Sequence, residues 1–232
     1  MQRILLAAAF LVVIPSLALA APCVPGTVTN YVGLGAGGCQ IGAFTFFNFE
    51  GLPSFSGGTA ISPAAVQVTP SINALGPRLD FSLSSNASAN QLLGIAIGFS
   101  ISGSTLNGAA LSMLGAAATG TGVVTAVEDI CRGGVFASNP SNCATSGQVT
   151  LVTAQDAIGP TGPDAQKFVI GSFFDVFVDI AVDGGPGGTA RLGTAGGPPG
   201  TVTAQFATPE AASISLIGIG LLSLWAFARC RK

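Results

Sequence analysis

The stretch KFVIGSFFDVFVDIAVD, from Lys167 to Asp183, is the part of the chain that decides the fold. Its apolar residues recur at every second position, the period of an extended strand with one face in a core and the other in water. The inward face would consist of Phe174, Val176, Val178, Ile180 and Val182, and the outward face of Asp175, Phe177, Asp179, Ala181 and Asp183. The Gly/Pro-rich residues 184–188 end this strand.

The rest of the chain repeats this pattern in shorter pieces. Apolar segments separated by Gly, Pro, Asn and Ser are typical of an antiparallel all-β domain. We expect strands over residues 27–32, 41–49, 64–69, 78–83, 92–102 and 148–154, two strands with a turn near Gly120 within 109–127, and a final hairpin of 189–193 and 201–206. The predicted fold is mainly β, an antiparallel and jelly-roll-like β-sandwich over residues 21–207, a length that suits one domain.

Composition narrows the choice of partners. Charged residues make up 8% of the chain, and residues 21–207 carry four basic and nine acidic residues, a net charge of −5. Nucleic acid is not expected as a partner, because phosphate binding needs clustered Lys and Arg. Disordered chains combine low hydrophobicity with high charge. Since 49% of this chain is hydrophobic, we expect it to bury a core.

The first twenty residues resemble a secretory signal peptide in their order of parts. Arg3 precedes the apolar run 4–14, and Ala18-Leu19-Ala20 fits a small-x-small cleavage pattern. Cleavage after Ala20 is the prediction, and an uncleaved anchor is the alternative, although the run is short for a bilayer. A lipoprotein is excluded because Pro22 precedes Cys23.

The predicted mature domain contains four cysteines, and an oxidising compartment favours their pairing. Four cysteines allow three pairings. We favour the local pairs Cys23 with Cys39 and Cys131 with Cys143, because each closes a short loop rich in Gly, Asn or Ser. A zinc site is not expected, since the chain has neither a CxxC motif nor a histidine.

Acidic residues on the strand 167–183 invite a functional interpretation. Asp175, Asp179 and Asp183 are spaced four residues apart, so neighbours lie about 13 Å apart at roughly 3.3 Å per residue. Glycosidase pairs need about 5–9.5 Å, and calcium needs several converging oxygens. We therefore interpret this face as solvated. We interpret Glu128-Asp129 as an acidic rim on a disulfide loop rather than a ligand site.

Several kinds of chemistry are missing. The chain has no histidine, which excludes Ser-His and Cys-His nucleophile arrangements. A secreted hydrolase would need Asp80 or Asp156 to converge with Asp175. The only Trp is Trp225 in the C-terminal apolar segment, and the only Tyr is Tyr31, so a flat platform for a sugar has little support. We expect no enzymatic activity, cofactor or metal site.

The C-terminus closes with a second apolar segment. Residues 211–228 carry no charge and would span about 27 Å as a helix, close to the thickness of a bilayer core. Trp225 lies near one end, and Arg229, Arg231 and Lys232 follow. The positive-inside rule places these cations in the cytoplasm. The sequence therefore predicts a transmembrane helix with the main domain outside.

The order of parts from 208 to 232 resembles the PEP-CTERM sorting signal. Pro209-Glu210-Ala211 stands where the family has its motif, with Ala211 in place of a second Pro, and 229–232 is the basic tip. The stretch Gly37-Gly38-Cys39 before a Phe-rich strand is similar to small secreted members. The resemblance implies an exported protein of a Gram-negative bacterium that an exosortase, a membrane protease or transpeptidase, recognises at Pro209 and Glu210.

The family is associated with exopolysaccharide and biofilm matrix, so the resemblance also implies an exopolysaccharide partner. Our leading hypothesis is a non-enzymatic protein of the cell surface or extracellular matrix. Its C-terminal helix would hold it in the membrane before processing, and Arg229, Arg231 and Lys232 would fix its topology. The alternative is a secreted module that binds polysaccharide or calcium.

Overall fold

The computed structural model describes residues 20–136, 143, 147–194 and 196–209. Its strands are β1 (Gly26–Thr27), β2 (Cys39–Ile41), β3 (Phe44–Pro53), β4 (Thr59–Ala60), β5 (Gln67–Ile72), β6 (Pro77–Leu83), β7 (Ser85–Ala87), β8 (Leu92–Leu114), β9 (Ala116–Thr119), β10 (Val123–Arg132), β11 (Gln148–Gln155), β12 (Asp164–Asp183), β13 (Thr189–Leu192) and β14 (Gly200–Ala207). Within these ranges the helices are α1 (Val28–Val32), η1 (Gly35–Gly37) and η2 (Pro63–Ala65). The chain is mainly β, as the sequence predicts.

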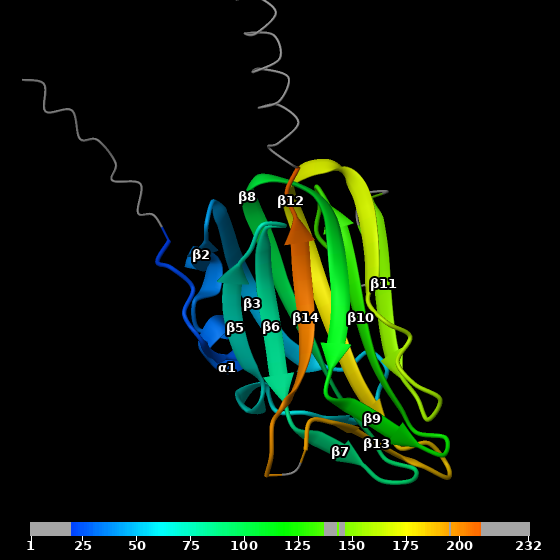
Figure 1. The fold of residues 1–232 in the computed structure, drawn as a ribbon. Helices are drawn as coiled ribbons and strands as arrows, with labels where there is room; N and C mark the ends of the chain where they lie inside the picture. Colours follow the sequence, from blue (N-terminus) through cyan, green and yellow to red (C-terminus); the bar gives the residue numbers. More distant parts are fainter. Residues whose placement is uncertain (1–19, 137–142, 144–146, 195, 210–232) are drawn as a thin grey trace, which may run out of the picture.

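The strands form two facing layers (Figure 1). Hydrogen bonds join them into one continuous sheet in the order β1-β5-β6-β14-β8-β12-β10-β11, with β3 added beside β8 and β2 beside β3. Residues 95–103 of β8 pair with β3, whereas residues 108–114 pair with β14. The sheet therefore folds over along β8, and the predicted antiparallel β-sandwich is confirmed.

The two layers of the sandwich differ in their strands. The β3 sheet comprises β2, β3, the first half of β8, residues 173–183 of β12, β10 and β11. The β14 sheet comprises β1, β5, β6, β14 and the second half of β8. A separate three-stranded sheet, β7-β13-β9, closes the lower end of the sandwich in Figure 1.

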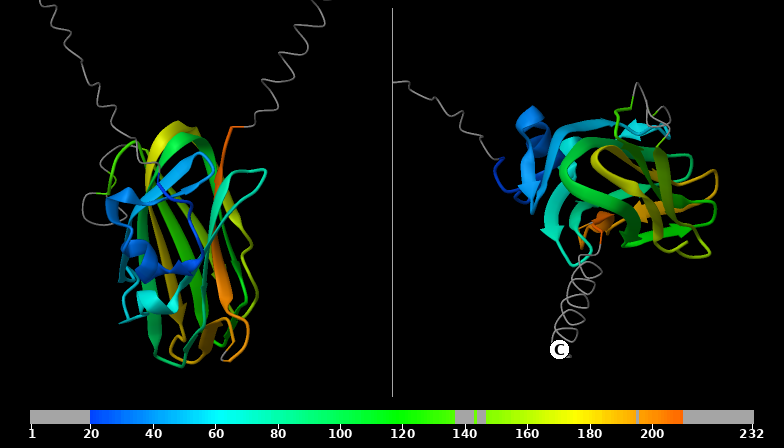
Figure 2. Two further views of the ribbon diagram at one scale, coloured as in Figure 1. Left: turned by 90° about the vertical axis from the view of Figure 1, so that its left-hand side faces the viewer. Right: turned by 90° about the horizontal axis from the view of Figure 1, so that it is seen from above.

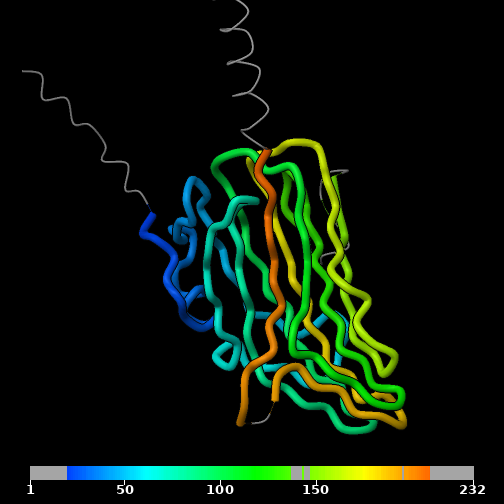
Figure 3. Tube along the Cα trace, in the orientation of Figure 1, coloured from blue at the N-terminus to red at the C-terminus, as the bar shows by residue number. Residues whose placement is uncertain are grey.

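The long strands β8 and β12 cross between the layers at the upper end of the trace in Figure 3. Gly103 lies at the bend of β8 with φ +129°, and a Cβ there would stand 2.3 Å from the carbonyl oxygen of Ala43. Only glycine fits this close approach. In β12 the register against β8 shifts between Lys167 and Phe173, which gives the second bend.

Aromatic rings from both layers form the centre of the core. Phe46 and Phe99 come from the β3 sheet, and Phe81 and Phe206 from the β14 sheet, and all four are buried. Ring centroids lie 6.2 Å apart for Phe99–Phe206 and 6.3 Å apart for Phe81–Phe99. The predicted inward face of β12 is confirmed, because each of its members is buried: Phe174, Val176, Val178, Ile180 and Val182.

The prediction of a strand over 27–32 is wrong, because this segment forms the short helix α1 after β1. Thr27 Oγ1 accepts the backbone N–H of Asn30 at 3.2 Å, and Asn30 Oδ1 accepts that of Thr27 at 2.8 Å. This capping box satisfies two backbone donors. Val28 and Tyr31 share the buried side of the helix, and Tyr31 contacts Phe49 at a ring distance of 4.8 Å. Local capping and burial override the strand preference of valine.

The predicted strand 41–49 is two strands. A turn at Gly42, which has φ +61°, divides β2 from β3. Further along β3 the register against β8 shifts between Phe47 and Glu50, and Asn48 has φ +53°. This irregularity is a β-bulge in β3.

The other predicted strands fare differently. Those over 78–83, 92–102 and 148–154 correspond to β6, the first part of β8 and β11, and the turn near Gly120 separates β9 from β10. The segment 64–69 starts in η2 and becomes strand only at β5. The final hairpin is wrong: β13 pairs with β7 and β9, and β14 with β6 and β8. β13 and β14 therefore belong to different sheets. Directly after β13, the N–H of Gly193 donates to Gly115 O, just before β9, and not to β14.

Both favoured disulfides are confirmed. Cys23–Cys39 ties the N-terminal segment to β2, and Cys131–Cys143 ties the end of β10 to the loop that follows it. Figure 2 shows the N-terminal segment and α1 lying against one side of the sandwich. Two disulfides fit an oxidising compartment outside the cytoplasm.

The free edge of β11 is covered by the chain that leads into β12. Asp164 Oδ2 accepts the N–H of Val152 at 2.9 Å, and Thr161 Oγ1 accepts that of Ala154 at 2.9 Å. The side-chain amide of Gln166 donates to Thr150 O at 2.8 Å. Much of this edge is therefore occupied by groups of the same chain.

The part of the chain described here contains no helix that is long and apolar enough to cross a membrane. The predicted transmembrane segment 211–228 and the signal peptide up to residue 19 lie outside the described residues.

Candidate functional site

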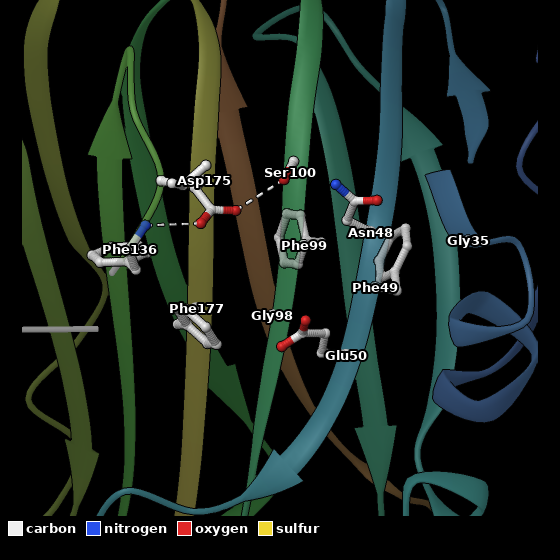
Figure 4. Close-up of a pocket in the computed structure, with 11 residues that line it drawn as sticks. Gly35, Asn48, Phe49, Glu50, Gly98, Phe99, Ser100, Phe136, Asp175 and Phe177 are labelled. Atoms are coloured by element: carbon white, nitrogen blue, oxygen red, sulfur yellow. Dashed lines mark hydrogen bonds between the residues drawn. The ribbon is translucent and has the colours of Figure 1, made fainter. Parts of the chain in front are cut away.

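A groove of about 450 Å³ opens on the outer face of the β3 sheet (Figure 4). It lies between β3 and the start of the loop that follows β10. Among the described residues, its lining consists of Gly35, Asn48, Phe49, Glu50, Gly98, Phe99, Ser100, Val135, Phe136, Asp175 and Phe177.

Two cross-strand rows make the floor of the groove. Glu50 of β3 is opposite Gly98 of β8, which is opposite Phe177 of β12. In the neighbouring row, Ser100 of β8 is opposite Asp175 of β12. Directly opposed residues of paired strands project on the same face, so strands far apart in sequence bring these side chains together.

Glycine at position 98 makes room for the aromatic ring of the floor. A Cβ built on Gly98 would stand 2.8 Å from Cε1 of Phe177 and 3.3 Å from its Cζ. The ring of Phe177 therefore lies over the backbone of β8, in the space that a larger residue at 98 would occupy.

The bulge in β3 supplies the polar side of the groove. The left-handed backbone of Asn48 lets Phe49 enter the core while Asn48 and Glu50 stay exposed. Among the described residues, the side chains of Asn48 and Glu50 have no hydrogen-bond partner. Their polar atoms are available to a ligand.

Asp175 positions the opposite wall. Its carboxylate accepts the hydroxyl of Ser100 at 2.9 Å and the backbone N–H of Phe136 at 3.1 Å, as the dashed lines of Figure 4 show. The second bond holds the disulfide loop against the sheet. The ring of Phe136 then lies 5.3 Å from that of Phe177, at an interplanar angle of 60°.

Asp179 fixes a second loop over the same face. Its carboxylate accepts the N–H of Phe55 at 3.3 Å and the hydroxyl of Ser56 at 3.0 Å, and its exposed fraction is 8%. The ring of Phe55 meets that of Phe177 edge to face at 5.6 Å. Phe177 is therefore held between two rings.

The prediction of a solvated aspartate face is therefore wrong. Asp175 and Asp179 accept hydrogen bonds from loops, and Asp183 accepts the N–H of Gly185 at 2.8 Å in the turn after β12. Charge-assisted hydrogen bonds of this kind order loops more firmly than neutral ones. The aspartates build the outer face as anchors for its loops.

The acidic rim predicted at Glu128-Asp129 is wrong in its first member. Glu128 is fully buried on the inner face of β10, opposite Leu151 and Val178. Neither carboxyl oxygen of Glu128 has a hydrogen-bond partner among the described residues. Burial, and to a lesser degree the charge of Asp129, raises the pKa of Glu128 well above its ordinary value of 4.5. Asp129 is on the outer face and accepts bonds from Thr150 and Gln148.

The structure does not bring together the carboxylates that a hydrolase would need. Asp80 lies on the outer face of the β14 sheet in an ion pair with Arg78 at 2.8 Å. Asp156 closes the turn after β11 by accepting the N–H groups of Ile158 and Gly159. Asp175 lies in the groove. The three carboxylates belong to three separate parts of the surface.

Tyr31 is not a sugar platform, because it is buried and its hydroxyl donates to Val24 O at 2.9 Å. Burial raises its pKa to about 12. Within the described ranges, no group of three or more side chains could hold a metal ion. Pro209 is described, whereas Glu210, Arg229, Arg231, Lys232 and Trp225 lie outside the described residues.

Sequence reasoning missed the groove residues Asn48, Glu50, Phe136 and Phe177. One signal was present, because Phe177 is a large apolar residue at an outward position between two aspartates. Asn48 and Glu50 gave none, since their role depends on the bulge and on the pairing of β3 with β8.

Comparison with known proteins identifies no family. No protein-family model and no curated protein matches the chain. A solved structure with some likeness is that of TmCBM61 in complex with beta-1,4-galactotriose, with 8% identity over 66% of this chain and 86% of that chain and a TM-score of 0.29. A TM-score this low carries no argument about the present protein.

Proposed function

We propose that this protein is an exported, non-catalytic β-sandwich of the cell surface or extracellular matrix that binds polysaccharide in the groove of its β3 sheet. The observation that carries the proposal is the combination of aromatic rings and unpaired polar groups in one rigid groove. A sugar ring has apolar faces and a rim of hydroxyls, so it needs both. Ligand sites characteristically pair apolar walls with a few polar groups, in volumes of about 300–1,000 Å³.

Each part of the groove has a place in this proposal. The rings of Phe177 and Phe136 offer apolar surface to a sugar face. Asn48 can donate and accept hydrogen bonds to hydroxyls, whereas Glu50 only accepts them. Paired strands and the Cys131–Cys143 disulfide hold these groups in place, which lowers the entropy lost on binding.

Binding without catalysis is the proposal because the two carboxylates of the groove are in different situations. Both oxygens of Asp175 hold the wall through Ser100 and Phe136. Glu50 is two strands away, at a backbone separation of about 12 Å given the usual spacing of strands and residues. Within the described part of the chain, neither residue has a partner placed for general acid–base work.

The test compares two phenylalanines of one strand. We expect the full-length protein, purified in mild detergent, to bind at least one member of a panel of neutral, acidic and amino polysaccharides in calorimetry. Phe177→Ala should weaken that binding about 30-fold, because removal of a central aromatic contact typically costs about 2 kcal/mol. Phe173→Ala is the control, since Phe173 shares the strand and the face but does not line the groove.

Binding that survives Phe177→Ala, or that is lost equally in Phe173→Ala, would contradict the proposed site. Failure of the wild-type protein to bind any polysaccharide of the panel would contradict the function. Thermal melting of both variants checks that the fold is intact.

We further propose that the C-terminal segment is a PEP-CTERM-type sorting signal acted on by an exosortase. The structural support is the place where the sandwich ends. β14 ends at Ala207, and both the N–H and the hydroxyl of Thr208 donate to Leu75 O, at 2.8 and 3.1 Å. Cleavage near Pro209-Glu210 would therefore remove the tail without opening a strand.

The intact mass of the protein from membrane and extracellular fractions of its own organism tests this delivery. We expect a C-terminus near Pro209, and an added mass would indicate transfer to a surface molecule. A chain that still ends at Lys232 in the membrane fraction would contradict processing.

A further inference from the structure

We infer that the groove selects sugars that carry a free amino group, so that the ligand is a positively charged polysaccharide. This inference rests on the proposed polysaccharide binding and names its substrate class. The charges that surround the groove are the reason.

The described lining of the groove is acidic and has no compensating cation. Glu50 and Asp175 line it, and none of the described lining residues is Lys or Arg. The sequence extends this statement to the segments around the groove, because no Lys or Arg occurs between Arg3 and Arg78 or between Arg132 and Lys167. Both β3 and the part of the disulfide loop after Arg132 are therefore free of positively charged side chains.

The four cations of the domain are directed elsewhere. Arg78 pairs with Asp80 on the β14 sheet, and Arg191 belongs to β13 in the three-stranded sheet. Lys167 precedes the bend of β12 and pairs with Gly108 in the second half of β8.

Arg132 is the cation nearest to the groove in sequence. It is opposite the inward-facing Phe174, so it projects on the other face from Asp175. Its Nη1 donates to Val169 O at 3.3 Å. No cation of the domain is therefore placed to neutralise Glu50.

The two carboxylates have different capacities for a ligand. Both carboxylate oxygens of Asp175 already accept a hydrogen bond. The negative charge of Asp175 nevertheless stays in the wall of the groove. The carboxylate of Glu50 has no hydrogen-bond partner among the described residues and is exposed. An ammonium group beside it would form a charge-assisted hydrogen bond, which is stronger than a bond to a hydroxyl.

The negative charges of the groove also discriminate against acidic sugars. A uronic acid or a sulfated sugar would place a negative charge beside Glu50 and Asp175, and like charges at short range reduce affinity. The face of the Phe177 ring adds attraction for a cation. A bare metal ion does not fit, because within the described residues no group of three or more ligands converges.

A sugar is favoured over a lysine-rich peptide because of the groove's other groups. The amide of Asn48 is exposed without a partner, and it suits the hydroxyls that flank the amine of an amino sugar. The ring pair Phe136–Phe177 offers flat apolar surface to a pyranose face. A lysine side chain would use the carboxylates and leave both features empty.

The experiment compares ligands that differ only in the amine. Calorimetry of the full-length protein in mild detergent uses a β-1,4-linked glucosamine hexamer, its fully N-acetylated counterpart, a galacturonate hexamer and an oligolysine. We expect the glucosamine hexamer to bind about tenfold more tightly than the N-acetylated one, and the galacturonate to bind most weakly. Added salt should reduce this preference, because exposed charges are screened.

Substitution of Glu50 assigns the preference to the groove. Glu50→Gln keeps the shape of the side chain and should weaken glucosamine binding about three- to fivefold, the range for an exposed charge pair, with no change for the N-acetylated sugar. Asp156→Asn is the control. It also removes one negative charge, and its amide oxygen can still accept from Ile158 and Gly159 in the turn after β11.

The outcomes separate this inference from the function it rests on. Equal affinity for the two hexamers would overturn the amino-sugar inference and leave polysaccharide binding in place. Oligolysine binding as tightly as the glucosamine hexamer, or equal effects of Glu50→Gln and Asp156→Asn, would also overturn it. Absence of binding to any sugar would overturn both.

Discussion

The outer faces of the two sheets use their polar residues in opposite ways. On the β14 sheet the polar groups bond one another across strands. Asp80 Oδ1 accepts from Arg78 at 2.8 Å and from Thr203 at 2.6 Å, and the hydroxyls of Ser82 and Thr201 are 3.0 Å apart. These polar side chains on the β14 sheet therefore find their hydrogen-bond partners on the same face.

The β3 sheet leaves polar groups unpaired on both of its faces. Asn48 and Glu50 are unpaired outside, within the described part of the chain, and Glu128 is unpaired inside. In a protein with so few charges, this difference separates a face whose polar groups bond one another from the face on which we propose that polysaccharide binds. The following changes test that contrast, from the largest expected effect to the smallest.

Removal of the disulfide behind the groove wall should have the largest effect. Cys131→Ser with Cys143→Ser opens a loop of 12 residues, so we expect a loss of about 3 kcal/mol in the free energy of unfolding, together with loss of polysaccharide binding. Urea unfolding and calorimetry measure the two effects.

The other disulfide is the matched control. Cys23→Ser with Cys39→Ser, at a separation of 16 residues, should cost a similar free energy and leave the affinity within about twofold, since these cysteines do not line the groove. Equal losses of affinity in the two double variants would show that the disulfide loop is not specific to binding.

Replacement of the buried carboxyl should stabilise the β3 sheet. Glu128→Leu is expected to raise the free energy of unfolding by about 2 kcal/mol at pH 8, because it removes an unpaired polar group from the core.

The pH dependence of the wild-type protein has a definite sign. Because the folded pKa of Glu128 is raised above its ordinary 4.5, its contribution is fully present below about pH 4.5 and is lost as pH rises through the folded value. The free energy of unfolding should fall by at most about 1.4 kcal/mol per pH unit from this one group. Denaturant titrations from pH 5 to 8 should show this decline in the wild type and a flatter curve in Glu128→Leu. A decline of the same size in both would mean that another group is responsible.

A methyl group in the floor of the groove should act on binding more than on stability. Gly98→Ala places a Cβ 2.8 Å from the ring of Phe177, and the ring can shift because it is the end of a side chain. We expect polysaccharide affinity to fall about tenfold, which corresponds to about 1.4 kcal/mol. Gly108→Ala is the control, because this glycine is in the half of β8 that pairs with β14. An equal loss of affinity in Gly108→Ala would contradict a specific role of Gly98 in the floor of the groove.

The smallest effect is expected on the self-satisfied face. Thr203→Val removes the hydroxyl that bonds Asp80 and should lower the free energy of unfolding by about 1 kcal/mol, with polysaccharide affinity unchanged in calorimetry. Any change in affinity would mean that the two faces are coupled.

The successes and failures of sequence reasoning have a common physical basis. The alternation in 167–183 predicts both the strand and its buried face, because side-chain period is a local property. The short loops between cysteines likewise favour the observed disulfides. The helix α1 was missed because a capping pair, Thr27 with Asn30, outweighs the valines around it.

The groove could not be predicted, because its floor depends on pairing between distant strands. Glu50, Gly98 and Phe177 meet only through the register of three strands and the bulge at Asn48. The outward position of Glu128 was predicted from its neighbour Cys131, whereas β10 is a regular strand through Arg132 whose alternation places Glu128 on the buried face. The alternation of side chains along a strand determines which residues share a face. It does not determine which of the two faces is covered by a loop or by the other sheet.

The covered edge of β11 has a consequence for a protein held at high local density. An open strand edge invites hydrogen bonding by a neighbouring copy, and repeated pairing of this kind leads to cross-β fibrils. Here Asp164, Thr161 and Gln166 already occupy backbone groups of that edge. Neighbouring copies are therefore hindered from pairing through β11 and remain separate folded units, because Asp164 and Gln166 are themselves held in place by the pairing of β12 with β8.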